Sequence, residues 1–249
     1  MLKALILSSL FFSALVFIAN KPIEETHTPP SFVYENFNGG ITGRVIVPVE
    51  DIQRRRFRGS SYRNRGNSAS TSSESENQQN NIGNTIVSAH PISFSLPNDI
   101  SGEAVIIDQK DAVFIPNVTP VTVGTVVQFV NNDPFFHNVF SLTPGSRFNI
   151  GRRPTGDVYS KQIEAPKWKV TGIGPITLFC DVHSQMKATI LSLDTPYFTR
   201  LNEDGTYELN DLPEGTYELR VYNPGFELES KEITISSDKN IESNFNLTS

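Results

Sequence analysis

Cys180, His183 and Met186 follow one another at intervals of three residues, and their side chains all bind soft or borderline metals. Cys180 is the single cysteine of the chain, and Met186 is the single methionine apart from Met1. His137 lies upstream, at the start of an expected strand. One thiolate, two imidazoles and a weak axial thioether form the donor set of a trigonal electron-transfer copper site. The spacing therefore predicts a copper site with His137, Cys180, His183 and Met186 as ligands.

Copper suits this donor set better than zinc does. Thiolate and thioether favour Cu(I), imidazole suits both oxidation states, and a thioether is a poor zinc ligand. Taken singly, each residue has an ordinary interpretation, because a buried cysteine, histidine or methionine often only packs. The coincidence of the single cysteine, the single internal methionine and two of four histidines in one set favours the metal site.

The elements that must position these side chains are strands. Residues 176–182 form a β-branched and alternating run, which places Ile176, Leu178 and Cys180 on one face and points the thiol into an apolar interior. Residues 121–130 are expected to form another strand, and a turn then leads to His137 in a strand at residues 137–142. Further strands are expected at residues 41–49, 86–96, 103–107, 112–115, 158–163, 168–170, 187–193, 232–235 and 244–247.

These closely spaced runs predict an all-β protein, because no segment beyond the apolar N-terminus shows a sustained helical period. The formal charge of −6 and the isoelectric point near 5.3 argue against nucleic-acid binding. A single cysteine excludes an intrachain disulfide framework and an iron–sulfur cluster bound by this chain alone.

Residues 103–195 resemble a cupredoxin of the plastocyanin and amicyanin type. The resemblance rests on C-x-x-H-x-x-M at residues 180–186 and on N-N-D-x-x-x-H-N-V at residues 131–139. It implies a Greek-key β-sandwich with one type 1 copper ion, and a non-enzymatic role, since four protein ligands leave no open substrate position. It also implies that Asn138 ties the first histidine's strand to the ligand loop. The expected electron-transfer surface comprises His183, Pro134, Phe135 and Phe136.

Residues 196–249 contain a self-match at a ten-residue offset, because Gly-Thr-Tyr-Glu-Leu occurs at residues 205–209 and again at residues 215–219. This region resembles a carboxypeptidase regulatory-like module, a small β-sandwich of transthyretin-like fold. The resemblance covers only the later strands of such a module. Residues 41–49 and 86–96 are candidates for its first strands, in which case the copper domain is an insertion within the module.

The N-terminal region is expected to be organised differently. Residues 1–19 form a signal peptide or an uncleaved anchor, and residues 20–40 form a tether. Residues 41–102 hold strands interrupted by a disordered insertion at residues 51–84. The insertion is either a solvated loop or a docking segment for an acidic partner or an anionic membrane surface. Its arginines are Arg54, Arg55, Arg56, Arg58, Arg63 and Arg65.

Together these features predict an exported protein, periplasmic or at the cell surface, that carries single electrons on copper to a redox protein partner. If the leader is uncleaved, the N-terminus also tethers the protein to a membrane. Two other functions remain open on the sequence alone: a copper carrier or sensor that has no redox role, and a cell-surface interaction module.

Overall fold

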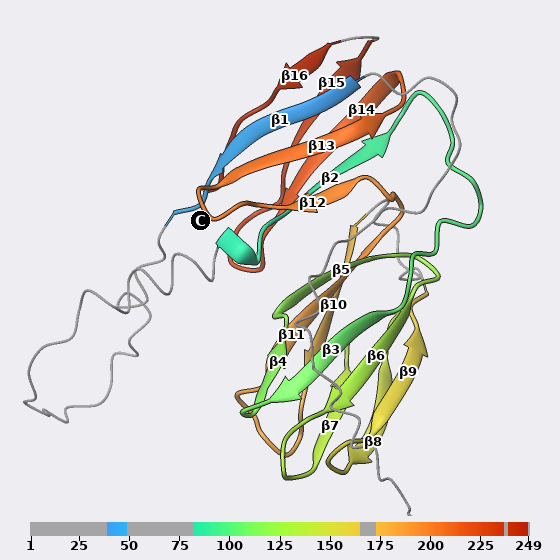
Figure 1. The fold of residues 1–249 in the computed structure, drawn as a ribbon, viewed down its shortest axis with the longest axis vertical. Helices are drawn as coiled ribbons and strands as arrows, with labels where there is room; N and C mark the ends of the chain where they lie inside the picture. The colour runs from blue at the N-terminus through green and yellow to red at the C-terminus, as the bar shows by residue number, and fades with distance from the viewer. Residues whose placement is uncertain (1–38, 49–81, 165–172, 237–238, 249) are drawn as a thin grey trace, which may run out of the picture.

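The computed structural model describes residues 39–48, 82–164, 173–236 and 239–248, which form two β-sandwiches (Figure 1). This confirms the all-β prediction. Residues 1–38, the arginine cluster and the strand expected at residues 168–170 lie outside the described residues. In the described ranges, no helix has the length and apolarity needed to span a membrane. The strands are β1 (Gly39–Ile46), β2 (Ile86–Pro91), β3 (Val105–Lys110), β4 (Val113–Ile115), β5 (Val118–Thr122), β6 (Val126–Asn131), β7 (His137–Ser141), β8 (Phe148–Arg153), β9 (Val158–Gln162), β10 (Ile173–Phe179), β11 (Lys187–Leu193), β12 (Phe198–Arg200), β13 (Thr206–Leu212), β14 (Gly215–Tyr222), β15 (Glu229–Ile235), β16 (Asn240–Glu242) and β17 (Phe245–Asn246).

The first sandwich packs the sheet β5-β11-β10-β7-β8 against the sheet β4-β3-β6-β9. Strand β6 shows why these residues form a strand, since its side chains alternate between buried and half-buried positions. The core between the sheets includes Ile107, Phe129, Leu178 and Ile190, together with Cys180 and Met186. The predicted inward direction of the thiol is confirmed, because Ile176, Leu178 and Cys180 are all buried.

The prediction from sequence merged two strands of this sandwich into one and missed another. The run at residues 121–130 is not one strand: β5 ends at Thr122 and β6 begins at Val126. Gly124 lies between them with φ of 92°, a conformation that favours glycine, so the chain turns there into the other sheet. Strand β8 was not expected, because residues 148–153 combine a short apolar start with glycine and two arginines.

The second sandwich unites strands from both ends of the chain. One sheet has the order β13-β1-β16, with β17 also paired to β1, and the other has the order β12-β2-β14-β15. The two copies of the repeated pentapeptide lie in different sheets, in β13 and β14. Each copy directs its tyrosine and leucine into the same core, since Tyr207, Leu209, Tyr217 and Leu219 are all buried together. The strands β1 and β2, which precede the first sandwich in sequence, thus complete the second.

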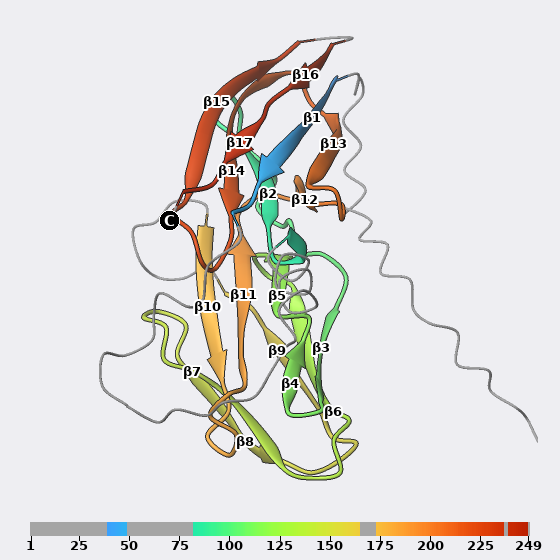
Figure 2. The same cartoon turned by 90° about the vertical axis from the view of Figure 1, so that its left-hand side faces the viewer.

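The two sandwiches meet through a small apolar cluster. Ile86 of β2 packs there with Val118 of β5 and with Leu191 and Leu193 of β11. Strand β11 leads from the first sandwich directly toward this junction, and its opposite end begins just after the loop that contains Cys180 and His183 (Figure 2). The candidate ligands therefore lie at the end of the first sandwich that faces away from the second.

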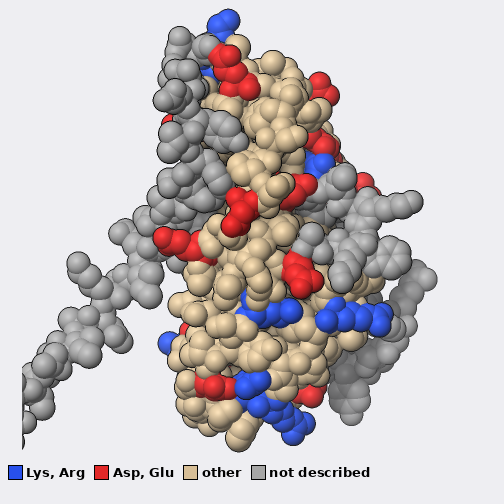
Figure 3. Space-filling model, turned by 90° about the vertical axis from the view of Figure 1, so that its right-hand side faces the viewer, with Lys and Arg blue, Asp and Glu red and all other residues tan. Residues whose placement is uncertain are grey.

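Charged side chains are unevenly distributed on the face shown in Figure 3. Aspartate and glutamate dominate the upper part of that face, and lysine and arginine are more frequent over its lower part. The lower part belongs to the first sandwich, which holds the candidate ligands.

Candidate metal centre

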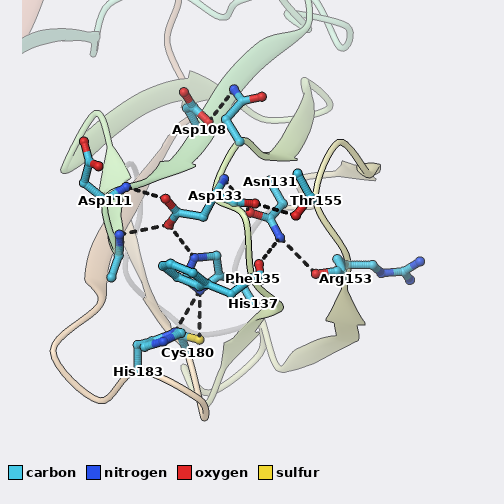
Figure 4. A network of polar contacts seen from close by, with 12 residues as sticks. Asp108, Asp111, Asn131, Asp133, Phe135, His137, Arg153, Thr155, Cys180 and His183 are labelled. Atoms are coloured by element: carbon cyan, nitrogen blue, oxygen red, sulfur yellow. Dashed lines mark hydrogen bonds and ion pairs between the residues drawn. The ribbon is translucent and has the colours of Figure 1, made fainter.

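His137, Cys180 and His183 lie close together at the end of the first sandwich. One ligand atom from each residue lies within 4.8 Å of the ligand atoms of the other two. His137 Nδ1 is 3.0 Å from His183 Nδ1 and 3.8 Å from Cys180 Sγ (Figure 4). Three of the four predicted ligands therefore direct donor atoms toward a common point.

Two strands and one loop bring these side chains together. Cys180 directly follows β10, whose last residue Phe179 pairs with Phe140 of β7, so the end of β10 lies beside β7. His137 is the first residue of β7. The loop after Cys180 then turns back, because the backbone N–H of Met186 donates a 3.0 Å hydrogen bond to the carbonyl of His183.

Met186 is buried in the same apolar cluster as Cys180. Its exposed fraction is 1%, compared with 4% for Cys180. The structure thus places the fourth predicted ligand in the core beside the thiol, while the other three donor atoms form the compact group.

Asn138 occupies the position expected for a residue that connects the two ligand segments. Its Oδ1 accepts a 2.8 Å hydrogen bond from the backbone N–H of Asp181, the residue after Cys180. Its Nδ2 donates a longer bond of 3.4 Å to Asn149 Oδ1 in β8. Asn138 is itself 1% exposed, whereas Asp181 is exposed, so the bond connects a buried side chain to the start of the ligand loop.

The spacing of the donor atoms fits a first-row metal ion. Bonds from such an ion to imidazole nitrogen and thiolate sulfur are about 2.0–2.3 Å, so ligand atoms around a trigonal ion lie roughly 3.6–3.8 Å apart. The distance between His137 Nδ1 and Cys180 Sγ has this size, and the two imidazole nitrogens are somewhat closer. A donor set of thiolate and imidazole suits copper or zinc rather than magnesium or calcium.

The carboxylate of Asp133, which the sequence analysis did not name as a site residue, contacts the ring nitrogen of His137 that does not face the other ligands. His137 Nε2 donates a 2.6 Å hydrogen bond to Asp133 Oδ2. The backbone N–H groups of Asp111 and Ala112 donate to the two oxygens of the same carboxylate, at 2.7 and 2.9 Å. Burial raises the pKa of Asp133, but the hydrogen bonds from Ala112, His137 and Asp111 and the charge of His137 hold this pKa below its ordinary value.

Asn131 and Thr155 fix the loop that carries Asp133. Asn131 Oδ1 accepts the backbone N–H of Asp133, and Asn131 Nδ2 donates to the carbonyls of Phe135 and Arg153. Thr155 Oγ1 donates to the carbonyl of Asp133. The sequence held one usable signal for this network, namely the Asn-Asn-Asp run four residues before His137, since such residues at a strand end often bond the backbone nearby.

One of the predicted surface residues, Phe135, lies against the two histidine rings. The Phe135 ring lies 5.1 Å from the ring centroid of His137 and 5.1 Å from that of His183. Phe136 and Pro134 are exposed, and His183 is half-buried, whereas His137 is fully buried. Val182, which is 41% exposed, adds an apolar side chain from the ligand loop that the sequence analysis did not name.

Comparison with known proteins bears first on the second sandwich. Residues 185–248 match the carboxypeptidase regulatory-like domain. The sequence resemblance found in the C-terminal region is thereby confirmed. The match begins inside the ligand loop, and the second sandwich of the structure adds β1 and β2 to its later strands. A search of curated proteins gave no match.

Solved structures similar to this chain include copper proteins. A copper-containing nitrite reductase from Thermus scotoductus SA-01 is 20% identical with a TM-score of 0.33, over 43% of this chain and 26% of that one. Amicyanin from Paracoccus versutus is 17% identical with a TM-score of 0.31, over 43% of this chain and 96% of that one. A purple cupredoxin from Nitrosopumilus maritimus is 22% identical with a TM-score of 0.29, over 36% of this chain and 99% of that one. The case for a metal centre in this chain comes from its own residues.

Proposed function

We propose that the protein is an exported electron carrier that binds one type 1 copper ion through His137, Cys180 and His183, with Met186 as the weak axial ligand. One observation carries this proposal: a buried thiol and two imidazole nitrogens lie within 4.8 Å of one another at a strand-end loop. A metal-binding thiol is deprotonated, so the proposed role of Cys180 is that of a thiolate.

Copper, when bound, supplies a one-electron change between Cu(I) and Cu(II). The chain's own residues keep the site similar in both states. His137 and Cys180 come from paired strands β7 and β10, and Asn138 fixes the start of the loop through the N–H of Asp181. A site held in this way changes little when an electron arrives or leaves, which is what fast electron transfer requires.

The proposed route for electrons passes through His183. His137 is fully buried, but His183 is half-buried, so its ring edge is the ligand nearest to solvent. Phe135 lies against both histidine rings, and Phe136 and Val182, which neighbour Phe135 and His183 in sequence, are exposed. An apolar surface of this kind suits a brief contact with a redox protein partner. With four protein ligands, the proposed site has no open position for a substrate, so the role is that of a carrier.

The proposed location is outside the cytoplasm, in a periplasm or at a cell surface. This part of the proposal rests on the apolar leader at residues 4–19, which follows Lys3. If the leader remains uncleaved, it provides a membrane tether.

Voltammetry of the copper-loaded full chain tests the carrier role. We expect a reversible one-electron couple with copper retained in both states, and no such couple in Cys180→Ala. A protein that binds Cu(I) but gives it up readily to a competing chelator, with no reversible couple, would support a copper carrier instead. A protein that binds no copper at all would leave only the interaction-module class.

A further inference from the structure

A buried carboxylate, that of Asp133, contacts one of the candidate metal ligands. This residue lies in the loop between β6 and β7 and is 3% exposed, and its Oδ2 is 2.6 Å from His137 Nε2 (Figure 4). Within the described part of the chain, the polar contacts of the His137 ring come from Asp133, Cys180 and His183.

The contact with Asp133 determines which nitrogen of His137 can bind a metal. A carboxylate accepts hydrogen bonds, so Nε2 must carry the hydrogen, and a neutral ring then has no hydrogen on Nδ1. Nδ1 is the atom that faces Cys180 Sγ and His183 Nδ1. Asp133 therefore selects the ring form whose free lone pair points at the metal position.

The Asp133 carboxylate is itself fixed by backbone N–H groups from another part of the sandwich. Asp111 and Ala112 form the turn between β3 and β4, and both have φ of 56°. This left-handed turn aims two consecutive N–H groups at the carboxylate, in the manner of a small anion nest. The conformation is unfavourable for alanine, and the strain is consistent with a turn that serves a nearby site.

The position of this charge also has an electrostatic consequence. A negative group that is buried and one imidazole away from the metal interacts with it more strongly than a solvated surface charge does. Such a charge stabilises the more positive state of the metal. For copper, it favours Cu(II) over Cu(I) and so lowers the reduction potential.

We propose that Asp133 is a positioning residue of the metal centre, which fixes His137 in the Nε2–H form and lowers the reduction potential through its buried charge. This inference rests on the proposed copper function. The chain offers a matched control. Asp157→Asn removes a partly exposed carboxylate that contacts Arg153.

The first experiment reads the ring form of His137 by nitrogen–proton NMR in the metal-free full chain. We expect the hydrogen on Nε2 in the wild type, and a hydrogen on Nδ1 would overturn the proposal. This measurement needs neither copper nor a variant that folds. It therefore separates a failure of the Asp133 inference from a failure of copper binding.

The second experiment compares reduction potentials of the copper-loaded proteins. Asp133→Asn is expected to raise the potential, with the ratio of Cu(II) to Cu(I) affinity falling about tenfold, equal to ~59 mV for one electron. Asp157→Asn is expected to leave the potential near that of the wild type. An unchanged potential in Asp133→Asn, or an equal shift in Asp133→Asn and Asp157→Asn, would show that Asp133 serves only the stability of the loop.

Discussion

Asn138 connects the two chain segments that supply the candidate ligands. It belongs to β7, directly after His137, and its side-chain oxygen accepts the N–H of Asp181. Removal of this buried acceptor would break a hydrogen bond next to Cys180, and one hydrogen bond contributes about 0.5–1.5 kcal/mol net to stability.

We therefore predict that Asn138→Ala lowers the free energy of unfolding by about 0.5–1.5 kcal/mol and releases copper faster than the wild type. Urea denaturation and copper transfer to a chelator measure the two effects. Asn132→Ala is the matched control, because its amide bonds Asp108 at an exposed position and does not reach the ligand loop. Equal copper release from both variants would contradict the connecting role of Asn138.

At the scale of strands, the position of β1 can be tested by adding one carbon atom to Gly43. A Cβ built on Gly43 would lie 1.9 Å from the carbonyl oxygen of Ser243, because β1 is enclosed between β13 on one side and β16 and β17 on the other. A backbone carbonyl cannot move aside as the end of a flexible side chain can, so the neighbouring segment would have to shift.

Gly43→Ala is accordingly expected to destabilise the second sandwich by about 1–3 kcal/mol or more. Gly83→Ala serves as its control, because a Cβ at Gly83 meets nothing within 4 Å. Thermal and urea unfolding of the two variants compare the effects. If Gly43→Ala were as stable as Gly83→Ala, β1 could not occupy the position between β13 and β16.

The sequence predicted strands well where one pattern repeated over a whole element, and poorly where the pattern changed within a run. Residues 187–193 were predicted with the same limits as β11, because their β-branched and apolar character continues to both ends. Residues 121–130 were merged into one strand, since Gly124 gave the single sign of the turn. The pairing of β1 with β13 depends on contacts distant in sequence, and local pattern indicates such pairings only weakly.

For the candidate site, the residue types indicated the donors but not their support. The rarity of sulfur in the chain drew attention to Cys180 and Met186. Asp133 could not be assigned in the same way, because its role depends on the turn at Asp111 and Ala112, which lies in a different hairpin. The sequence alone does not show which residues from different parts of the chain lie close together in the fold.

At the scale of the whole molecule, strand β11 connects the candidate metal centre to the junction between the sandwiches. Its seven residues span roughly 23 Å at the usual rise of a strand. Asp194, the residue after β11, is 2.7 Å from His90 Nδ1 in β2, and His90 Nε2 is 2.9 Å from Ser88 Oγ. This polar group adds to the apolar cluster that joins the two sandwiches.

The His90–Asp194 contact predicts how stability depends on pH. Burial raises the pKa of Asp194, but the hydrogen bond and charge of His90 and the charge of Arg220 outweigh it, so the pKa lies below its ordinary 3.8. The folded state thus favours the ionised carboxylate, and this contribution is present above about pH 4 and is lost as pH falls through the folded-state pKa.

We expect wild type to exceed Asp194→Asn in unfolding free energy at pH 6, with the difference shrinking toward pH 3. Denaturant unfolding at several pH values measures this difference. The exposed Asp211→Asn, at a residue with φ of 56° that asparagine tolerates, is the control. A difference between wild type and Asp194→Asn that stays constant from pH 6 to pH 3 would contradict this role of the contact.

The optical spectrum of the full chain titrated with Cu(II) tests the central proposal most directly. We predict that one equivalent of Cu(II) produces an intense visible band from charge transfer between the Cys180 thiolate and the metal, and that Cys180→Ala lacks this band. A protein that stays colourless with Cu(II), or a band that persists unchanged in Cys180→Ala, would contradict the proposal that this chain holds a type 1 copper centre.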